Sequence, residues 1–328
     1  MGKVIPANLN NYPRIGDRPE QQKLRRTIAA LDRGEASLED LERVQREVTR
    51  EVILEQVEAG IQLVTDGQIR WDDPVTYFAR SLEGIRIAGL VRFFDTNTYF
   101  RQPVVEAPVR WRRPVLVDDF RFAAEASPVP VKAVVPGPYT LARLSVDRYY
   151  SDLPKLTSAY AAAVREEIRA LMEAGAQVIQ IDEPSLVRHR DAVEVALPAL
   201  AGLAELERSD SVRLGLLTYW GTLDQNLDRV LELPFDFLAL DLVEGRRDLE
   251  GLSRWKLKGK VFGLGLVNGR NTKLEDPAEL AAAVKRIQDS CGFPWAYLQP
   301  SCGLEFLPRD TARRKLEIIA EAARLVSE

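Results

Sequence analysis

Short runs of apolar, largely β-branched residues alternate with longer amphipathic stretches along most of the chain. Such alternation is typical of βα units, in which helices connect parallel strands. Eight runs have the character of strands, namely 4–7, 61–65, 131–135, 178–181, 213–218, 237–240, 260–266 and 295–298. The pattern therefore predicts an α/β fold, a (β/α)8 TIM barrel that forms one domain over residues 1–328.

Helical spacing and end signals predict the main helices. Residues 24–58 repeat apolar positions with a helical period, and Ser37-Leu-Glu-Asp40 resembles a capping box before their second half. A long helix is predicted over 153–173, with Gly175 at its C-terminal end. A last helix is predicted from about Arg309.

The stretch 84–122 breaks this rhythm, because β-branched and aromatic residues fill it without a helical period. It predicts a β-hairpin inserted after the second βα unit. A doubly wound open sheet is the competing architecture. That architecture favours a glycine-rich phosphate turn after an early strand, which this sequence lacks, so the barrel is the better prediction.

Composition narrows the class of partner. The 328 residues are 46% hydrophobic and carry a net charge of -4 without long blocks of one sign, so neither nucleic acid nor a membrane surface is expected as a partner. No stretch approaches the ~20 apolar residues of a membrane span, and MGKVIPANLNNYPR lacks the apolar core of a signal peptide. Two cysteines, Cys291 and Cys302, indicate no disulfide framework. We therefore expect a cytoplasmic protein that binds a small molecule.

Polar residues gather just after the predicted strands. The active site of a barrel lies at the C-terminal ends of its strands, so these positions are the candidates for chemistry. In chain order they are Asn8, Asn10, Asn11, Arg14, Asp66, Gln68, Arg70, Trp71, Asp72, Asp73, Asp182, Glu183, Tyr219, Trp220, Asp241, Glu244, Asn268, Arg270, Asn271, Ser301 and Cys302. The turn 137–140 adds free N–H groups that can hold an anion or a carboxylate.

Each of these residues also has a structural interpretation. Asp182 and Glu183 can cap the following helix, and an isolated Cys302 is more often a small buried apolar side chain than a ligand. His189 lies among arginines, and we expect it to be solvated rather than catalytic. The convergence of so many polar residues on one face of the predicted barrel favours a functional site.

Four segments resemble the C-terminal catalytic barrel of cobalamin-independent methionine synthase, in that family's order. They are Asp66-Gly-Gln with 70–78, Val135-Pro-Gly-Pro-Tyr-Thr140, Gln180-Ile-Asp-Glu-Pro184 and Pro300-Ser-Cys-Gly-Leu304. The chain also resembles the short, barrel-only members. The resemblance implies that the thiolate of homocysteine, activated by zinc, takes a methyl group from a folate or, in short members, from a methyl-corrinoid. A methyl-donor protein is then a possible partner.

The zinc ligands of that family are largely replaced. Its histidine and cysteine after the fifth strand align with Leu217 and Tyr219, and its glutamate aligns with Asp241. Cys302 alone matches outright, so the resemblance implies Cys302 and Asp241 as the remaining metal ligands. A tetrahedral zinc site requires three or four protein ligands, so we expect an atypical or missing zinc site.

Other family positions have changed as well. Asn10-Asn11 replaces a glycine-serine turn that holds the substrate carboxylate, and Gln68 replaces an acceptor-binding glutamate. Leu144 aligns with a tryptophan that stacks on folate, and Arg270 with a histidine of proton transfer, whereas the acidic Asp182 is kept. The predicted substrate-binding residues are Asn10, Asn11, Arg14, Gln68, Trp71, Asp73 and Asp182, and the predicted catalytic residues are Asp182, Glu183, Tyr219, Asp241 and Arg270.

Three functions agree with these residues. The first is a methionine-synthase-like S-methyltransferase that methylates a thiol such as homocysteine, without an assigned cofactor. The second is a metal-independent barrel enzyme that acts on a different small carboxylate-bearing substrate through the same acidic and basic groups. The third is a binding protein without catalysis, which the density of costly buried charges disfavours. The resemblance places methyl transfer first.

Overall fold

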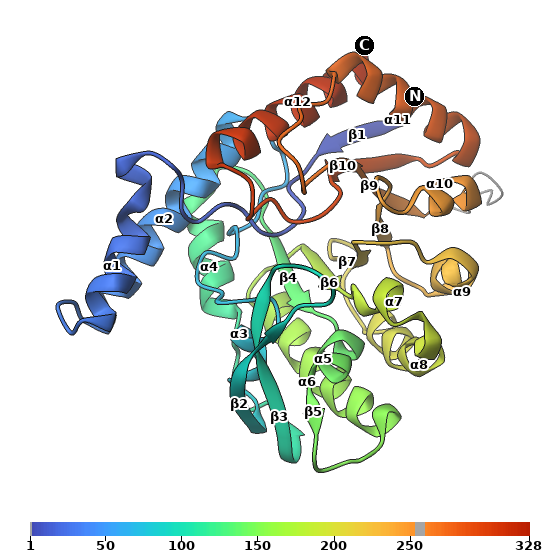
Figure 1. Ribbon diagram of the computed structural model, residues 1–328. Coiled ribbons are helices and arrows are strands. Elements are labelled where there is room, and N and C mark those ends of the chain that lie inside the picture. Colours follow the sequence, from blue (N-terminus) through green and yellow to red (C-terminus); the bar gives the residue numbers. More distant parts are fainter. Residues whose placement is uncertain (1, 253–259) are drawn as a thin grey trace. The chain divides into compact units, whose positions relative to one another are not determined.

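The computed structural model describes residues 2–252 and 260–328, which form two compact units (Figure 1). Unit 1 contains residues 2–70, 122–131 and 260–328, and unit 2 contains residues 71–121 and 132–252. In each unit parallel strands alternate along the chain with helices. The single-domain organisation stays a prediction.

Unit 1 contains three parallel strands, β1 (Lys3–Pro6), β10 (Trp295–Pro300) and β9 (Val261–Val267), with β10 between the other two. β9 and β10 are buried along almost their whole length, as expected for parallel strands covered on both faces. Its regular helices are α1 (Lys23–Asp32), α2 (Leu38–Glu58), α11 (Pro277–Cys291) and α12 (Arg309–Ser327), with a short 3-10 turn at Pro19–Gln22.

The predicted strand 61–65 is wrong as a regular strand. Isolated bridges join Leu63 to Ala7 and Val64 to Val131, but no continuous ladder forms. The reason is local, because the Gln56 side chain accepts from the N–H of Thr65 and donates to its C=O, both at 3.0 Å. A side chain therefore takes the main-chain groups that a neighbouring strand would have paired.

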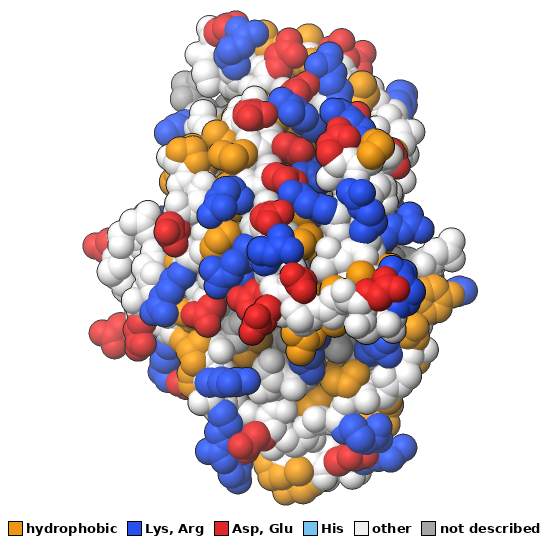
Figure 2. Space-filling view, turned by 90° about the vertical axis from the view of Figure 1, so that its left-hand side faces the viewer, with side chains coloured by type: hydrophobic (Ala, Val, Ile, Leu, Met, Phe, Trp, Pro, Cys, Tyr) orange, Lys and Arg blue, Asp and Glu red, His pale blue; other side chains and the backbone are white. Residues whose placement is uncertain are grey.

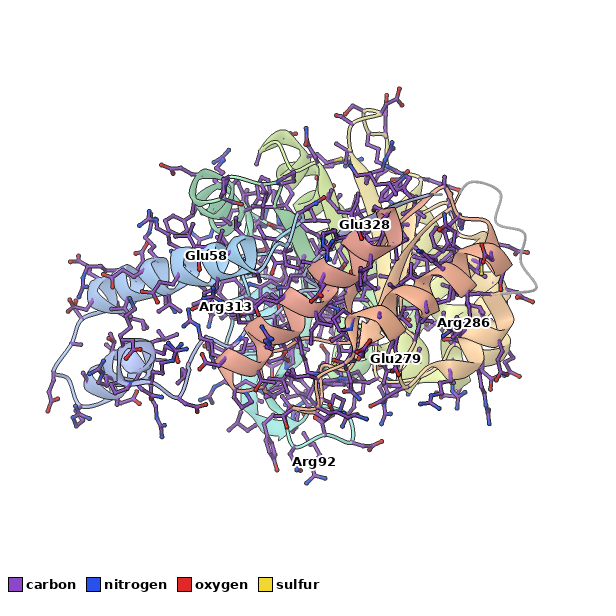
Figure 3. All side chains as sticks on the ribbon, turned by 90° about the horizontal axis from the view of Figure 1, so that it is seen from above. Glu58, Arg92, Glu279, Arg286, Arg313 and Glu328 are labelled. Carbon is purple, nitrogen blue, oxygen red and sulfur yellow. The ribbon has the colours of Figure 1, made fainter. Side chains whose placement is uncertain are left out.

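The predicted helix ends of unit 1 are confirmed. Ser37 forms a capping box with Asp40 at the start of α2, and α12 begins at Arg309. Arg313 of α12 reaches Glu58 at the end of α2, with 3.2 Å between the charged atoms (Figure 3).

Unit 2 is built on four parallel strands in the order β4 (Lys132–Pro136), β6 (Val178–Asp182), β7 (Arg213–Thr218) and β8 (Phe237–Asp241). A second sheet pairs β2 (Glu83–Arg92) antiparallel with β3 (Tyr99–Arg110), and the short β5 (Val146–Asp147) lies parallel to β3. The antiparallel pair occupies the stretch for which a hairpin was predicted.

The helices of unit 2 follow its strands. They are α3 (Thr76–Ala79), α5 (Pro138–Leu144), α6 (Leu153–Glu173), α7 (Ser185–Arg188), α8 (Val193–Ala204), α9 (Leu227–Glu232) and α10 (Arg246–Leu252), with 3-10 turns at Arg190–Ala192 and Asp224–Asn226. α4 (Val117–Ala126) carries residues of both units. The predicted helix 153–173 is confirmed, and Gly175 follows it with a φ of 94°, the left-handed conformation that favours glycine.

The surface carries both signs of charge. Figure 2 shows Lys and Arg side chains interspersed with Asp and Glu on one face of the molecule. Among the described helices, none is both long enough and apolar enough to span a membrane.

Candidate active site

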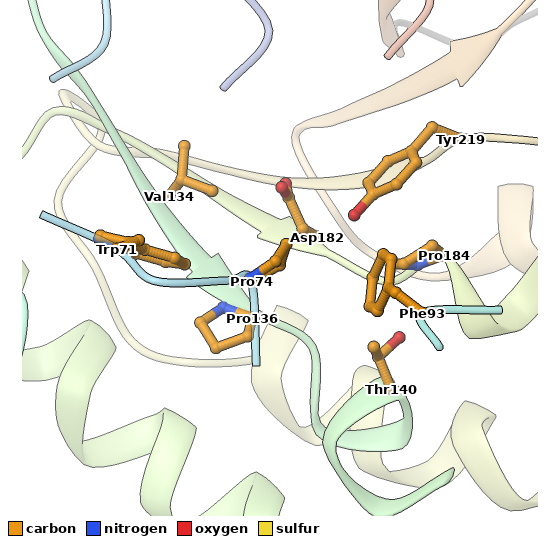
Figure 4. Close-up of a pocket in the computed structure, with 9 residues that line it drawn as sticks. All are labelled: Trp71, Pro74, Phe93, Val134, Pro136, Thr140, Asp182, Pro184 and Tyr219. Atoms are coloured by element: carbon orange, nitrogen blue, oxygen red, sulfur yellow. The ribbon is translucent and has the colours of Figure 1, made fainter. Parts of the chain in front are cut away.

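A small pocket lies at the ends of β4, β6 and β7 in unit 2 (Figure 4). It encloses about 250 Å³, part of it open to solvent. Three aromatic residues, four other apolar residues, one hydroxyl and one carboxylate line it, namely Trp71, Phe93, Tyr219, Pro74, Val134, Pro136, Pro184, Thr140 and Asp182. Of the predicted site residues, the structure therefore brings together Asp182, Trp71 and Tyr219.

Asp182 is the one acidic side chain among the described residues that line this pocket. It is the last residue of β6 and is 7% exposed. Its Oδ1 accepts a hydrogen bond of 2.8 Å from Nε2 of Gln180, which precedes it by two residues on the same face of the strand. Figure 4 shows the Asp182 side chain between Trp71 and Tyr219. The carboxylate is thus held in place at the edge of an apolar cavity.

The helix start after β4 binds a carboxylate of the protein itself. Glu183 accepts from the N–H groups of Tyr139 and Thr140, at 3.0 and 2.6 Å, and from the Thr140 hydroxyl. Gly137 is required here, because a Cβ would stand 2.2 Å from the carboxylate of Glu183. Burial raises the pKa of Glu183 to about 8, against these hydrogen bonds.

Glu183 therefore occupies the turn that was expected to hold a ligand, and its catalytic role stays a prediction. The turn does hold a carboxylate, but the carboxylate belongs to the chain rather than to a ligand. Glu183 caps the preceding α5, not the helix that follows it, and has no exposed surface. Since the helix start engages both of its oxygens, a structural role accounts for this residue.

Asp241 has a comparable structural environment at the end of β8. Its Oδ2 accepts from the N–H of Trp220 at 3.1 Å, and its Oδ1 accepts from the N–H groups of Val243 and Glu244. Trp220 has a φ of 66°, an uncommon conformation for a bulky residue that often marks functional loops. Asp241 stabilises this strained loop after β7.

The stability of the protein should depend on the protonation of Asp241. Burial raises the pKa of this carboxyl from 3.8 to about 6, so the folded protein binds an additional proton between these values. Stability is then fully present at low pH and falls as the pH rises towards 6, by up to about 1.4 kcal/mol per pH unit. The Asp241→Asn variant should lack this fall. Urea unfolding of both proteins across this pH range tests the prediction, and parallel curves would contradict it.

The turn between β2 and β3 contributes one wall of the pocket. Phe93 packs edge-on against Trp220, with 5.5 Å between ring centres, and Phe94 lies 5.5 Å from the ring of His189. His189 is half-buried rather than solvated, and burial lowers its pKa. The prediction for its surroundings was wrong because residues distant in sequence cover it.

Asp73 has main-chain partners that the sequence did not predict, and its role in substrate binding stays a prediction. Its Oδ1 accepts from the N–H groups of Val75 and Thr76, at 2.9 and 2.6 Å. Its Oδ2 accepts from the Thr76 hydroxyl and from the N–H of Arg101 on β3. Asp73 thus joins the start of α3 to the hairpin, and its carboxylate does not line the pocket.

The remaining predicted residues belong to unit 1. Asn10 is buried and its Oδ1 accepts from the N–H of Asn11 at 2.7 Å, whereas Arg14 is half-buried and Arg270 is exposed. Gln68 is buried with a φ of 53°, and its Oε1 has no hydrogen-bond partner among the described residues. Their roles in substrate binding and catalysis stay predictions.

The side chains at the expected zinc positions do not fit a zinc ion. Leu217 is fully buried and has no donor atom, Tyr219 offers a phenol, and both oxygens of Asp241 accept main-chain hydrogen bonds. Cys302 is buried in unit 1 and forms no disulfide. Within residues 2–252 and 260–328, no group of three or more His, Cys, Asp or Glu side chains could hold a metal ion.

Several residues of the site had not been singled out from the sequence. Lys132 and Gln180 are polar residues within buried strands, a pattern that could have been noticed. Phe93 reaches the pocket from a turn about 90 residues before Asp182, and no local pattern indicates this.

Comparison with known sequences identifies the family. Residues 13–325 match the family model for the catalytic domain of cobalamin-independent synthase. The methionine synthase of Sulfurisphaera tokodaii is 32% identical over 318 residues, which cover 96% of this chain and 91% of that protein. The methionine synthase of Saccharolobus solfataricus is 31% identical over 316 residues, covering 96% and 94%.

Solved structures agree on the fold. The B12-independent methionine synthase from Shewanella sp. W3-18-1, in complex with selenomethionine, has a TM-score of 0.82 at 21% identity and covers 100% of this chain and 98% of its own. A putative vitamin-B12 independent methionine synthase from Listeria monocytogenes has a TM-score of 0.76 at 17% identity, covering 99% of each. The predicted α/β barrel class is confirmed. The chain belongs to the cobalamin-independent methionine synthase family, as a methionine-synthase-like methyltransferase.

Proposed function

We propose that this protein transfers a methyl group to the sulfur of an amino-acid thiol such as homocysteine, whose ammonium group binds Asp182. One observation carries the proposal: among the described residues that line the pocket, Asp182 is the one charged side chain, and the others are apolar or aromatic except for Thr140. No Lys or Arg is among the described residues that line it. A cation is the group that such a carboxylate binds most strongly.

The aromatic walls suit the rest of such a substrate. Trp71 is buried and stacks on Tyr77, with 5.4 Å between ring centres, and this contact fixes the position of its ring. Divalent sulfur makes favourable contacts with aromatic rings. The Shewanella protein was solved with selenomethionine, an amino acid in which selenium replaces this sulfur.

The reaction requires a thiolate. The S–H bond breaks and its proton is released to solvent. The sulfur electron pair then forms the S–CH3 bond, and the donor leaves with the electrons of its own bond to carbon. We propose that the Tyr219 hydroxyl donates a hydrogen bond to the thiolate, because this phenol lies in the pocket wall beside Asp182 (Figure 4). No step of this scheme requires a metal ion bound by the protein itself.

The donor need not be the folate expected from the family. Leu144, at the position of the folate-stacking tryptophan, is 8% exposed, and its aliphatic side chain offers no ring for stacking. We propose a direct comparison of a methylfolate and a methyl-corrinoid as donors, with methionine formation as the readout. Calorimetry with L-methionine tests separately whether the protein binds the amino acid, without a methyl donor. Absence of both methionine binding and homocysteine methylation would contradict the proposed function.

We further propose that methyl transfer here does not use the family's zinc site, and we expect well below one zinc per chain. Plasma mass spectrometry on untagged protein, after zinc loading and dialysis, measures this. The combined substitution Leu217→His, Tyr219→Cys and Asp241→Glu is the matched control, because it restores the family's donors and should raise the zinc content. Stoichiometric zinc in the unaltered protein would contradict the proposal.

A further inference from the structure

Lys132 is a buried cation with an unusual partner. It opens β4, is 2% exposed, and its Nζ donates a hydrogen bond of 2.7 Å to Oε1 of Gln180. Gln180 in turn donates to Asp182, as described above. Three side chains therefore form a chain from the start of β4 to the carboxylate of the pocket.

The strand register explains why these three side chains meet. Lys132 lies opposite Val178 and Pro136 opposite Asp182 in the parallel pair of β4 and β6. Alternate residues of a strand share one face, so Lys132, Gln180 and Asp182 project to the same side of the sheet. Lys132 reaches diagonally to its neighbour two residues further along β6.

The other buried cations of the described chain are paired differently. Lys315 is fully buried and contacts the Glu275 carboxylate at 3.0 Å, and Arg309 contacts Glu55 at 2.9 Å. Both have a direct counter-charge, as buried charges usually do. Lys132 donates a hydrogen bond to a neutral amide instead, and that amide in turn binds the Asp182 carboxylate. Burial lowers the pKa of Lys132 to about 7, and the charge of Asp182 opposes this effect.

The chemistry of the three groups sets the direction of the chain. An ammonium only donates hydrogen bonds and a carboxylate only accepts them, whereas the amide of glutamine has one end of each kind. A donor at Lys132 requires the Gln180 oxygen to face it, which turns the Gln180 NH2 towards Asp182. Without this ammonium the Gln180 oxygen would lose the donor at Nζ of Lys132, and the amide that binds Asp182 would be held less firmly.

We infer that Lys132 is a positioning residue for the substrate site, acting through Gln180 to orient the Asp182 carboxylate towards the pocket. The inference rests on the proposed function, since it assumes that Asp182 binds the ammonium group of an amino acid. It gives a reason for a buried lysine at this position, where an apolar residue would avoid the free-energy cost of burying a charge.

The test uses Lys132→Met, which keeps the length of the side chain and removes its charge, with Lys315→Met as the matched control. We expect Lys132→Met to weaken L-methionine binding in calorimetry by about tenfold, as for one charge-assisted hydrogen bond. Lys315→Met should leave the affinity unchanged although it lowers stability. In the Asp182→Asn background, Lys132→Met should have no further effect on affinity.

The outcomes separate this inference from the proposed function. If the unaltered protein binds L-methionine and Lys132→Met binds it equally well, the inference is overturned and the proposed function stands. If the unaltered protein binds no L-methionine, the proposal that homocysteine is the methyl acceptor is contradicted. The coupling between Lys132 and Asp182 is then tested through the free energy of unfolding. Lys132→Met and Asp182→Asn should then be non-additive in urea unfolding, whereas additive effects would overturn the inferred coupling.

Discussion

Replacing Asp182 with asparagine should weaken L-methionine binding by about 100-fold, or ~3 kcal/mol, because a buried ammonium would lose its counter-charge. The substitution keeps the size of the side chain and an oxygen that can accept the hydrogen bond from Gln180. The loss would therefore report on charge rather than on packing. Calorimetric titration of the variant with L-methionine measures it.

The control is Asp276→Asn, which makes the same chemical change at the N-cap of α11. This aspartate accepts from two main-chain N–H groups and lies in unit 1, outside the pocket. Its substitution should leave L-methionine affinity unchanged. An Asp182→Asn variant with the affinity of the unaltered protein would refute the assignment of Asp182 to the ammonium group.

Truncating Glu183 to alanine should lower the free energy of unfolding by about 3 kcal/mol or more, since buried donors would lose their acceptor. The N–H groups of Tyr139 and Thr140 and the Thr140 hydroxyl all bind this carboxyl group. Urea unfolding measures the change. Glu183→Gln is the control, because it keeps one acceptor oxygen and should cost less. A loss below about 1 kcal/mol in the alanine variant would show that the capping contacts are weak.

The sequence predicted those elements whose pattern is set by their own residues. The apolar runs of β6, β7, β8 and β10 and the capped start of α2 lie where expected. The strand at 61–65 failed because the Gln56 side chain replaces a neighbouring strand at Thr65. Propensity and periodicity describe a segment by itself and do not reveal this competition.

The kinds of chemical group at the candidate site could be predicted from the sequence, but their hydrogen-bond partners could not. The free N–H groups of the turn 137–140 do bind a carboxylate, yet it comes from Glu183, more than forty residues later in the chain. Asp73 binds main-chain groups at the start of α3 and in β3, which the sequence did not predict, and its contact with substrate stays a prediction. The pairing of hydrogen-bond donors with acceptors depends on contacts between distant segments. A single sequence does not record those contacts.

The occupied helix start after β4 also affects which metabolites the protein can admit. In many α/β enzymes such a helix start binds the phosphate of a cofactor or sugar. Here a phosphate could enter only by displacing Glu183 from three hydrogen bonds and would meet another acidic group, Asp182, beside it. We therefore expect the start of α5 not to serve as a phosphate site, because the Glu183 carboxyl group already occupies it.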